Sequence, residues 1–333
     1  MMNTQTIFGT EAFTQLSPEW DSLAKQGITN TPFQTLAYQE SWWRNLHPDN
    51  GRLITITVRS DNHELIAIAS LYHDNGTIHF NGCVEETDYL DLITTPEHAE
   101  TGWTAVFEAL HHPEFPHWHT MELCNIPAAS PSRSLVAALA KKHNLSCQED
   151  IFEVCPIIPL PDSFAAYLAQ IDSKQRREIK RKLRRANGAE AQFVIINPED
   201  DLEQAVNEFL NLLQQSTFEK RDWLNQGRRA VFHETAQAAM KAGTLQLMFI
   251  EVEGHKAATL FNFDYNNRIW VYNSGLAPEA FGQLSLGVVL TAKAIEWAIE
   301  NGRSEFDFLR GNETYKYRFG AKDTEIFKIT LRK

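Results

Sequence analysis

The sequence of 333 residues is poor in cysteine and lacks long apolar runs. Its four cysteines show no C-x-x-C spacing, so we expect reduced thiols rather than a zinc site or a disulfide framework. No run of ~18 apolar residues occurs, so no membrane span is predicted. A basic N-terminal segment followed by an apolar run is also missing, which argues against a signal peptide. We therefore expect a cytoplasmic protein, with peripheral contact at the inner face of the membrane left open.

Basic residues are also fewer than acidic ones, which gives a net charge of −12. Affinity for nucleic acid comes mostly from neutralised phosphates, so no nucleic-acid partner is expected. The twelve histidines form no H-x-x-x-H or H-E-x-x-H pair, which predicts no metal site. The sequence has no G-x-S-x-G motif, which disfavours a serine hydrolase. Walker and G-x-G-x-x-G loops are absent too.

A faint internal repeat is present, in which residues 51–56 resemble residues 243–248. Each copy is predicted to form a helix, a three-stranded antiparallel meander, a helix and a further strand. The expected strands are 53–59, 64–72, 77–81 and 118–124, then 245–252, 256–264, 268–274 and 305–309. The expected helices are 38–46, 97–111, 229–241 and 286–300.

The repeat and the chain length together predict two domains. A proline-punctuated segment begins at Cys155, so we place the domains at 1–155 and 156–333. The predicted fold class is mixed α/β (α+β). It consists of two tandem units, each a mixed, mostly antiparallel sheet flanked by helices.

One helix concentrates the positive charge. Eight of the twelve residues from Lys174 to Arg185 are basic and only Glu178 is acidic, so this segment carries +7 and the rest of the chain −19. Asp172 is the expected N-cap. Three interpretations remain open: a solvated helix paired with acidic neighbours, a site for anionic groups such as CoA phosphates, polysaccharides or phosphate-bearing lipids, and a nucleic-acid surface. The overall acidity and the lack of interleaved aromatics weigh against the third.

A glycine-containing loop, 281–287, leads directly into the predicted helix 286–300. The first N–H groups of a helix lack intrahelical partners and lie at the positive end of its dipole, which suits a pyrophosphate. Gly282 and Gly287 would allow a close approach of the backbone to a ligand, and Ser285 could cap the helix or contact a phosphate. The alternative is a capped helix without a ligand.

The order of these motifs resembles the GNAT acyltransferases. It consists of the meander, the Gln-x-Ser-x-Gly loop at 283–287, a helix, a strand ending in the segment 307–311, and the Tyr-Lys-x-Arg-Phe-Gly segment 315–320. More narrowly, it looks like the CelD/BcsL-like group, which is associated with cellulose biosynthesis and related to the FemAB transferases. The segments 32–35 and 88–91 and the basic helix match as well, so the resemblance covers nearly the whole chain.

The resemblance implies an acyl-CoA-dependent N-acyltransferase, such as an N-acetyltransferase. An acetyl or longer acyl group would pass to an amine of a small-molecule, saccharide or lipid acceptor, which would bind in the cleft between the domains. Acyl-CoA would lie between splayed central strands. In the first copy the acidic run 85–88 would repel a pyrophosphate, so we infer a degenerate copy that helps to bind the acceptor. The expected cofactor-binding residues are Gln283, Leu284, Ser285, Leu286, Gly287 and Val288.

Acyl transfer to an amine needs a base, donors for the developing oxyanion and an acid for the leaving thiolate. Asp307 is the first candidate for the base or amine-orienting group; the alternative is a structural carboxylate paired with Arg310. Asp88 could orient the acceptor. Tyr272 and Tyr315 are candidate acids, or else packed aromatics. The expected catalytic residues are therefore Asp307, Tyr272 and Asp88. The expected substrate-binding residues are Asp88, Tyr89, Arg177, Arg181, Arg310, Tyr315 and Lys316.

Other functions remain open. A FemAB-like, aminoacyl-tRNA-dependent transferase would use the basic helix for tRNA. FemAB proteins also carry a long helical hairpin in the second domain, and the helices expected at 202–215 and 226–242 are too short for one. Another enzyme variant would use a long-chain acyl-CoA and a lipid amine. The alternative from a different class is a catalytically inactive binding protein in polysaccharide synthesis or export.

Overall fold

The computed structural model describes residues 3–83, 86–277 and 281–333. Glu85 of the acidic run lies outside the described residues. The chain divides into two compact units. Unit 1 comprises the described part of 1–154 together with 324–333, and unit 2 comprises that of 155–323. The last ten residues therefore belong to unit 1, whereas the sequence analysis assigned them to the second domain.

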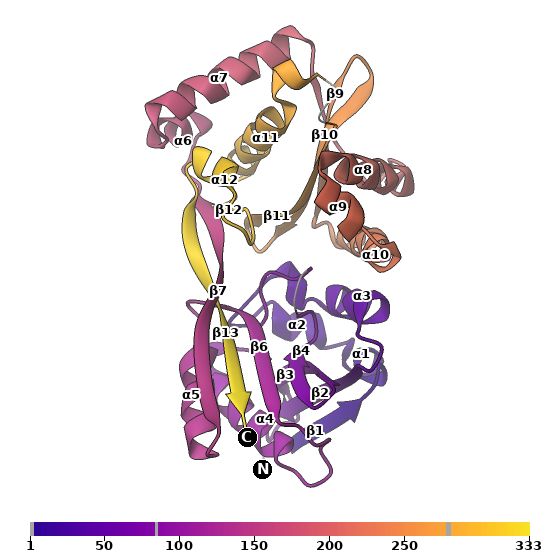
Figure 1. Ribbon diagram of the computed structural model, residues 1–333, viewed down its shortest axis with the longest axis vertical. Helices are drawn as coiled ribbons and strands as arrows, with labels where there is room; N and C mark the ends of the chain where they lie inside the picture. Colours follow the sequence, from indigo (N-terminus) through magenta and orange to yellow (C-terminus); the bar gives the residue numbers. More distant parts are fainter. Residues whose placement is uncertain (1–2, 84–85, 278–280) are drawn as a thin grey trace. The chain divides into compact units, whose positions relative to one another are not determined.

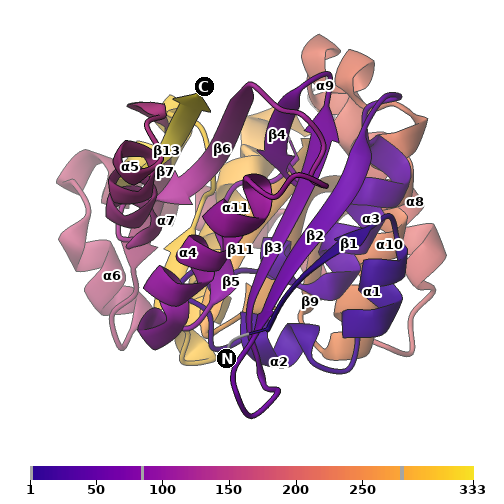
Figure 2. The same ribbon diagram turned by 90° about the horizontal axis from the view of Figure 1, so that it is seen from below.

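Unit 1 is built on a six-stranded path, β1-β2-β3-β4-β6-β13, in which β4 and β6 are parallel (Figures 1 and 2). Helix α4 packs on β1–β3, and α5 packs on α4. Trp42 and Trp43 contact Tyr72 from the other face. The elements are β1 (Asn3–Phe8), α1 (Glu11–Leu16), α2 (Trp20–Ala24), η1 (Pro32–Gln34), α3 (Leu36–Leu46), β2 (Arg52–Arg59), β3 (Leu65–Asp74), β4 (Thr77–Phe80), β5 (Ile93–Thr94), η2 (Pro96–His98), α4 (Ala99–Leu110), β6 (Thr120–Pro127), α5 (Ser132–Lys142) and β13 (Lys322–Arg332).

Unit 2 repeats this plan along the path β8-β9-β10-β11-β12-β7, in which β11 and β12 are parallel. Helices α6, α7 and α11 lie on one side of the strands and α8–α10 on the other (Figure 1). The elements are β7 (Ser146–Pro159), α6 (Phe164–Gln170), α7 (Ser173–Gly188), β8 (Gln192–Ile195), α8 (Leu202–Ser216), α9 (Phe218–Trp223), α10 (Gln226–Ala242), β9 (Leu245–Val252), β10 (His255–Tyr265), β11 (Arg268–Leu276), η3 (Gly282–Leu284), α11 (Leu286–Glu300), β12 (Glu305–Asp307) and α12 (Thr314–Arg318).

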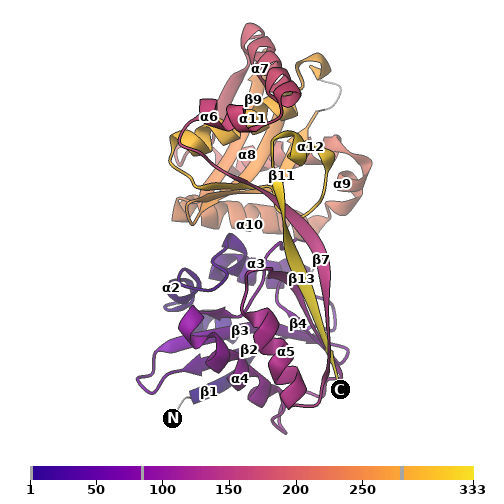
Figure 3. The same cartoon turned by 90° about the vertical axis from the view of Figure 1, so that its left-hand side faces the viewer.

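The two units share one strand order, which confirms the predicted tandem fold. In each unit an edge strand and a three-stranded meander lead to a parallel strand, followed by an antiparallel strand from a distant part of the chain. Strand β7 begins in unit 1 and ends in unit 2, and β13 returns the chain to unit 1. Figure 3 shows these two long strands running side by side.

The predicted elements of both copies are confirmed with small shifts at their ends. Helix α11 begins and ends at the predicted residues. Asp172 caps α7 by accepting hydrogen bonds from the N–H groups of Lys174 and Gln175, and Gly243 ends α10 in the left-handed conformation. Local patterns located these elements: apolar and β-branched runs between turn signals marked the strands, and helical periodicity marked the helices.

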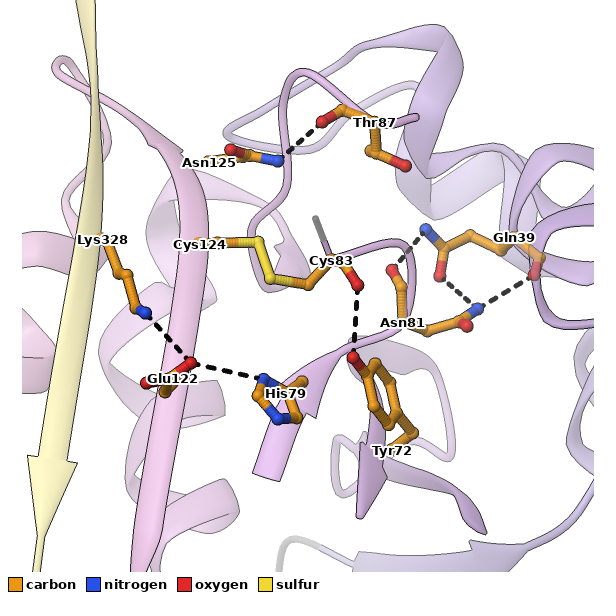
Figure 4. Close-up of a disulfide and its surroundings, with 10 residues drawn as sticks. All are labelled: Gln39, Tyr72, His79, Asn81, Cys83, Thr87, Glu122, Cys124, Asn125 and Lys328. Carbon is orange, nitrogen blue, oxygen red and sulfur yellow. Dashed lines mark hydrogen bonds and ion pairs between the residues drawn. A yellow bond between two sulfur atoms is a disulfide. The ribbon is translucent and has the colours of Figure 1, made fainter. Parts of the chain in front are cut away.

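The expectation of four reduced thiols is wrong in this structure. Cys83 and Cys124 form a disulfide (Figure 4), while Cys147 and Cys155 are free. The two bridged residues are 41 positions apart, and their Cα atoms lie 6.1 Å from each other, within the usual span of a disulfide. C-x-x-C spacing gives no information about such a long-range pair, because the fold brings its members together.

The disulfide has a definite place in the sheet of unit 1. Strands β4 and β6 pair from Thr77 and Thr120 to His79 and Glu122. Cys83 follows β4 and Cys124 lies in β6, so the bridge joins the two segments just beyond their paired part. The corresponding position in unit 2, beyond the paired part of β11 and β12, carries no such link.

Candidate functional site

A cavity of about 390 Å³ lies in unit 2 where two central strands part. Strands β11 and β12 pair only from Arg268 and Glu305 to Trp270 and Asp307; β12 then ends, while β11 continues to Leu276. No Asp, Glu, Lys or Arg is among the described residues that line the cavity, so it suits an uncharged group. The lining residues are Thr259, Leu260, Val271, Ser274, Gly275, Leu276, Ala277, Phe281, Gly282, Ser285, Leu286, Gly287, Val288, Leu290, Thr291, Phe308, Tyr315 and Phe319.

The start of α11 forms one side of this cavity. The Ser285 carbonyl accepts the N–H groups of Val288 and Val289. The N–H groups of Leu286 and Gly287 donate to no group in the described part of the chain. The expected cap is not formed, because the Ser285 side chain makes no capping bond and its backbone is left-handed, with φ of 54°. A non-glycine residue in this conformation is strained, and such strain is often found at binding sites.

Part of the loop predicted to bind the cofactor therefore lies at the cavity. Ser285, Leu286, Gly287 and Val288 line it, whereas Gln283 is exposed and Leu284 is buried in the core. Helix α7 packs against both η3 and α11, so its basic side chains lie beside the loop. Burial lowers the pKa of Lys182 on this helix; Glu178 opposes this shift, and the nearby positive charges of Arg181 and Arg318 add to it. The surroundings of the loop are therefore electropositive.

Lys220 of α9 is a feature that sequence reasoning missed. Its Nζ atom donates to the Ser274 carbonyl at 2.6 Å and to Asn273 Oδ1 at 3.1 Å, at the end of β11 that lines the cavity. Burial lowers the pKa of Lys220 to about 8; Glu313 opposes this shift and Lys316 adds to it. No local pattern marks this residue, because its burial arises from the packing of α9 on α8 and of α8 on β11.

Lys316 and Asp307 hold the turn that follows β12. The Nζ atom of Lys316, a residue only 2% exposed, donates to the carbonyls of Leu309, Arg310 and Gly311 at 3.1, 2.6 and 3.0 Å. Asp307 Oδ1 accepts the N–H of Leu309, whose φ of 58° is left-handed. Both predicted site residues therefore fix the backbone of this turn, and neither lines the cavity. The half-buried Arg310 is part of the turn itself.

The two tyrosines predicted as acids lie in different places. Tyr315 lines the cavity. The residue is 39% exposed as a whole, but the surrounding protein desolvates its phenol and raises its pKa, and Glu313 adds to the rise. Tyr272 is not among the lining residues; its ring packs with Phe232, Phe261 and Phe263.

The remaining predicted residues lie on α7 or in unit 1. Arg177 is exposed on α7, and Arg181 forms an ion pair with Glu178. Asp88 and Tyr89 are buried in the loop after β4 of unit 1, at 8% and 7% exposure. Close by, Asn125 Nδ2 donates to the carbonyl of Thr87 at 2.6 Å (Figure 4), so this loop is tied to β6.

Two absences are found within the described ranges. No three His, Cys, Asp or Glu side chains gather there in a way that could hold a metal ion. Over the same ranges, no helix combines the length and the apolar character needed to cross a bilayer.

One stretch of the sequence contributes most of the cavity between the parting strands. The same stretch contains the start of α11 with its free N–H groups and the basic helix α7 beside it. Residues 173–317 match the acetyltransferase (GNAT) domain model. This stretch contains α7, the cavity loop and Tyr315. A comparison with curated protein sequences found no match.

Solved structures with the same fold cover nearly the whole chain. The crystal structure of FemX has a TM-score of 0.66 at 10% identity and covers 97% of this chain and 96% of its own. L-PGS from Bacillus licheniformis gives 0.60 at 9% identity, with 95% and 91% covered. A tandem GNAT protein from the clavulanic acid biosynthesis pathway gives 0.51 at 13% identity, with 98% of each chain covered. At these identities the likeness shows the fold, which is that of tandem GNAT proteins.

Proposed function

We propose that this protein is an acyl-CoA-dependent N-acyltransferase with its donor site in unit 2. It would transfer an acetyl or longer acyl group to an amine of a small-molecule, saccharide or lipid acceptor. The observation that carries the proposal is the cavity of about 390 Å³ that opens between β11 and β12 onto the free N–H groups of α11. Unit 1 has no part in donor binding in this proposal, because a disulfide joins the corresponding strands there.

The residues of the site fit such a donor. The cavity lining is uncharged and largely apolar, which suits an acyl chain and its pantetheine arm. The N–H groups of Leu286 and Gly287 at the positive end of the α11 dipole would receive the pyrophosphate. A Cβ added at Gly287 would meet nothing within 4 Å, so there is room for a ligand against the backbone. The bound thioester would supply the acyl group.

The chain's own groups would manage the protons and the geometry. Tyr315 lines the cavity and keeps its proton at neutral pH, because burial raises its pKa, so its hydroxyl can donate a hydrogen bond to the leaving thiolate. Lys220, with a pKa of about 8, places a titrating group at the end of β11. We keep Asp307 as the candidate that orients the amine, acting through the turn that begins at Leu309. The acceptor side, including Asp88, Tyr89 and Arg310, remains a prediction.

The similarity to FemX supports a second candidate function. Its TM-score of 0.66 exceeds the 0.51 of the tandem GNAT protein, and both structures cover at least 96% of each chain. Transfer from an aminoacyl-tRNA, as in FemAB-type proteins, would use the same cavity for an aminoacyl group and the basic helix α7 for phosphates. The acceptor would again be an amine. A titration with CoA separates the two candidates.

The test is isothermal titration and thermal shift of the full chain with CoA, acetyl-CoA and a long-chain acyl-CoA. We expect saturable binding by the wild-type protein. Gly287→Glu should weaken the affinity for CoA at least tenfold, because its carboxylate would face the pyrophosphate. Gly287→Gln is the matched control of nearly equal size and should lose much less. Absence of binding at millimolar CoA would overturn the acyl-CoA proposal and favour the second candidate.

A further inference from the structure

Helix α7 presents a positively charged face over much of its length of about 24 Å (16 residues at 1.5 Å). At ~100° per residue, seven of its eight basic side chains occupy an arc of about 180°, and Ile179, Leu183 and Ala186 lie opposite. Ile179 and Ala186 are buried against the rest of unit 2. Six of the basic residues are exposed: Lys174, Arg177, Lys180, Arg181, Arg184 and Arg185.

The basic charges of α7 are almost unpaired. Among the described residues, Arg181 is the one basic side chain of α7 with a carboxylate in ion-pair range, that of Glu178 at 2.7 Å. The interpretation of α7 as a solvated helix balanced by acidic neighbours therefore fails. A concentrated block of exposed positive charge creates a local field that attracts anionic groups, which points to an anionic partner outside the chain.

Three features of this face decide between anionic partners. The basic residues form a continuous arc along a straight helix, which suits a flat surface. Within the described residues of α7 no aromatic side chain is available for base stacking. The acidic remainder of the chain, at −19, would be repelled by a polyanion that wraps around it.

We propose that α7 docks the protein onto a membrane surface rich in anionic phospholipid. Six exposed Lys and Arg side chains on one helix face fall within the range typical of such electrostatic docking. The exposed face has no large apolar side chain for insertion, so the contact is electrostatic and reversible. Because α7 packs against η3 and α11, docking would bring the cavity loop close to the bilayer.

Vesicle co-sedimentation of the full chain tests the proposal without any acyl donor, so its outcome is independent of the proposed activity. The vesicles are phosphatidylcholine with or without phosphatidylglycerol, at about 0.1 M and about 1 M salt, between which the Debye length falls from ~10 Å to ~3 Å. We expect binding only to vesicles that contain phosphatidylglycerol, and loss of binding at high salt.

The decisive variant carries Arg177→Glu, Lys180→Glu and Arg184→Glu. These side chains are exposed, so the variant should keep the circular dichroism spectrum of the wild type and bind vesicles at least tenfold more weakly. The matched control reverses three exposed lysines elsewhere, Lys141, Lys142 and Lys241, and should bind almost normally.

Three outcomes would overturn the proposal. The first is wild-type protein that does not bind vesicles containing phosphatidylglycerol at low salt. The second is equal weakening by the α7 variant and the control, which would assign the effect to net charge. The third is RNA that binds through the same three residues while vesicles do not, which would make α7 a nucleic-acid surface.

Discussion

At the scale of single residues, unit 2 uses two lysines in an unusual way. Lys220 and Lys316 are withdrawn from solvent, and both donate to backbone carbonyls at the edges of the cavity region. Each therefore sets the position of a backbone segment: Lys220 at the end of β11, Lys316 in the turn after β12. Their two positive charges lie close enough to affect one another, with Glu313 near both.

The lowered pKa of Lys220 predicts a pH dependence of stability. Its pKa is about 8 in the folded chain, against 10.5 for a free lysine. Between these values the unfolded chain binds more protons than the folded one, so this residue's contribution favours folding increasingly as pH rises from 8 to 10.5. We expect the unfolding free energy of the wild type to rise over this window relative to that of Lys220→Met.

Urea denaturation of both proteins at steps from pH 7 to pH 10.5 gives the measurement. Taking the difference between the two proteins removes the titration of groups they share. Lys241→Met, which alters an exposed lysine, serves as the control and should track the wild type. Difference curves for Lys220→Met that stay flat across the window would show that the residue is not desolvated as the structure has it.

At the scale of elements, local patterns predicted much of the fold and part of the site. Apolar, β-rich strand segments bounded by turn residues, and the helical period that begins at Leu286, can be read from neighbouring residues in the sequence. The cavity lining at Ser285–Val288 was predictable for the same reason. Lys220 and the Cys83–Cys124 bridge were not, because their environments come from segments far away in the sequence.

The contact between α8 and β11 gives a prediction at this scale. A Cβ added to Gly275 would lie 2.6 Å from the backbone N of Leu213 and 2.7 Å from the backbone C of Leu212. These are backbone atoms of a helix, so they cannot yield cheaply. We expect Gly275→Ala to lower the unfolding free energy by about 1–3 kcal/mol through overpacking, as measured by urea denaturation.

Gly275 also lines the cavity, so the same variant should weaken CoA binding if α8 is pushed away from β11. Gly287→Ala is the control, since its added methyl group meets nothing within 4 Å and should change stability by less than about 1 kcal/mol. A Gly275→Ala protein as stable as the wild type would mean that α8 and β11 are farther apart than in this structure.

At the scale of the whole molecule, the chain forms unit 1, then unit 2, and then returns to unit 1 with its last strand. Strand β7 carries the chain from unit 1 into unit 2, and β13 carries it back, so unit 1 is completed by a strand from the C-terminal end of the sequence. A repeat-based boundary near 155 could not anticipate the return, because β13 follows the second copy directly. Its partner β6 is about 200 residues earlier in the chain.

Because β13 packs in unit 1 and the end of β7 packs in unit 2, we predict that two similar substitutions in these strands destabilise different units. Ile329 in β13 belongs to the core of unit 1, and Ile158 in β7 belongs to the core of unit 2. Each change to Ala should cost about 2–5 kcal/mol. In hydrogen exchange, Ile329→Ala should speed exchange in β3, β4 and β6, and Ile158→Ala in β10, β11 and β12. If Ile329→Ala instead loosened the strands of unit 2, β13 would belong to the second domain, as the repeat alone suggests.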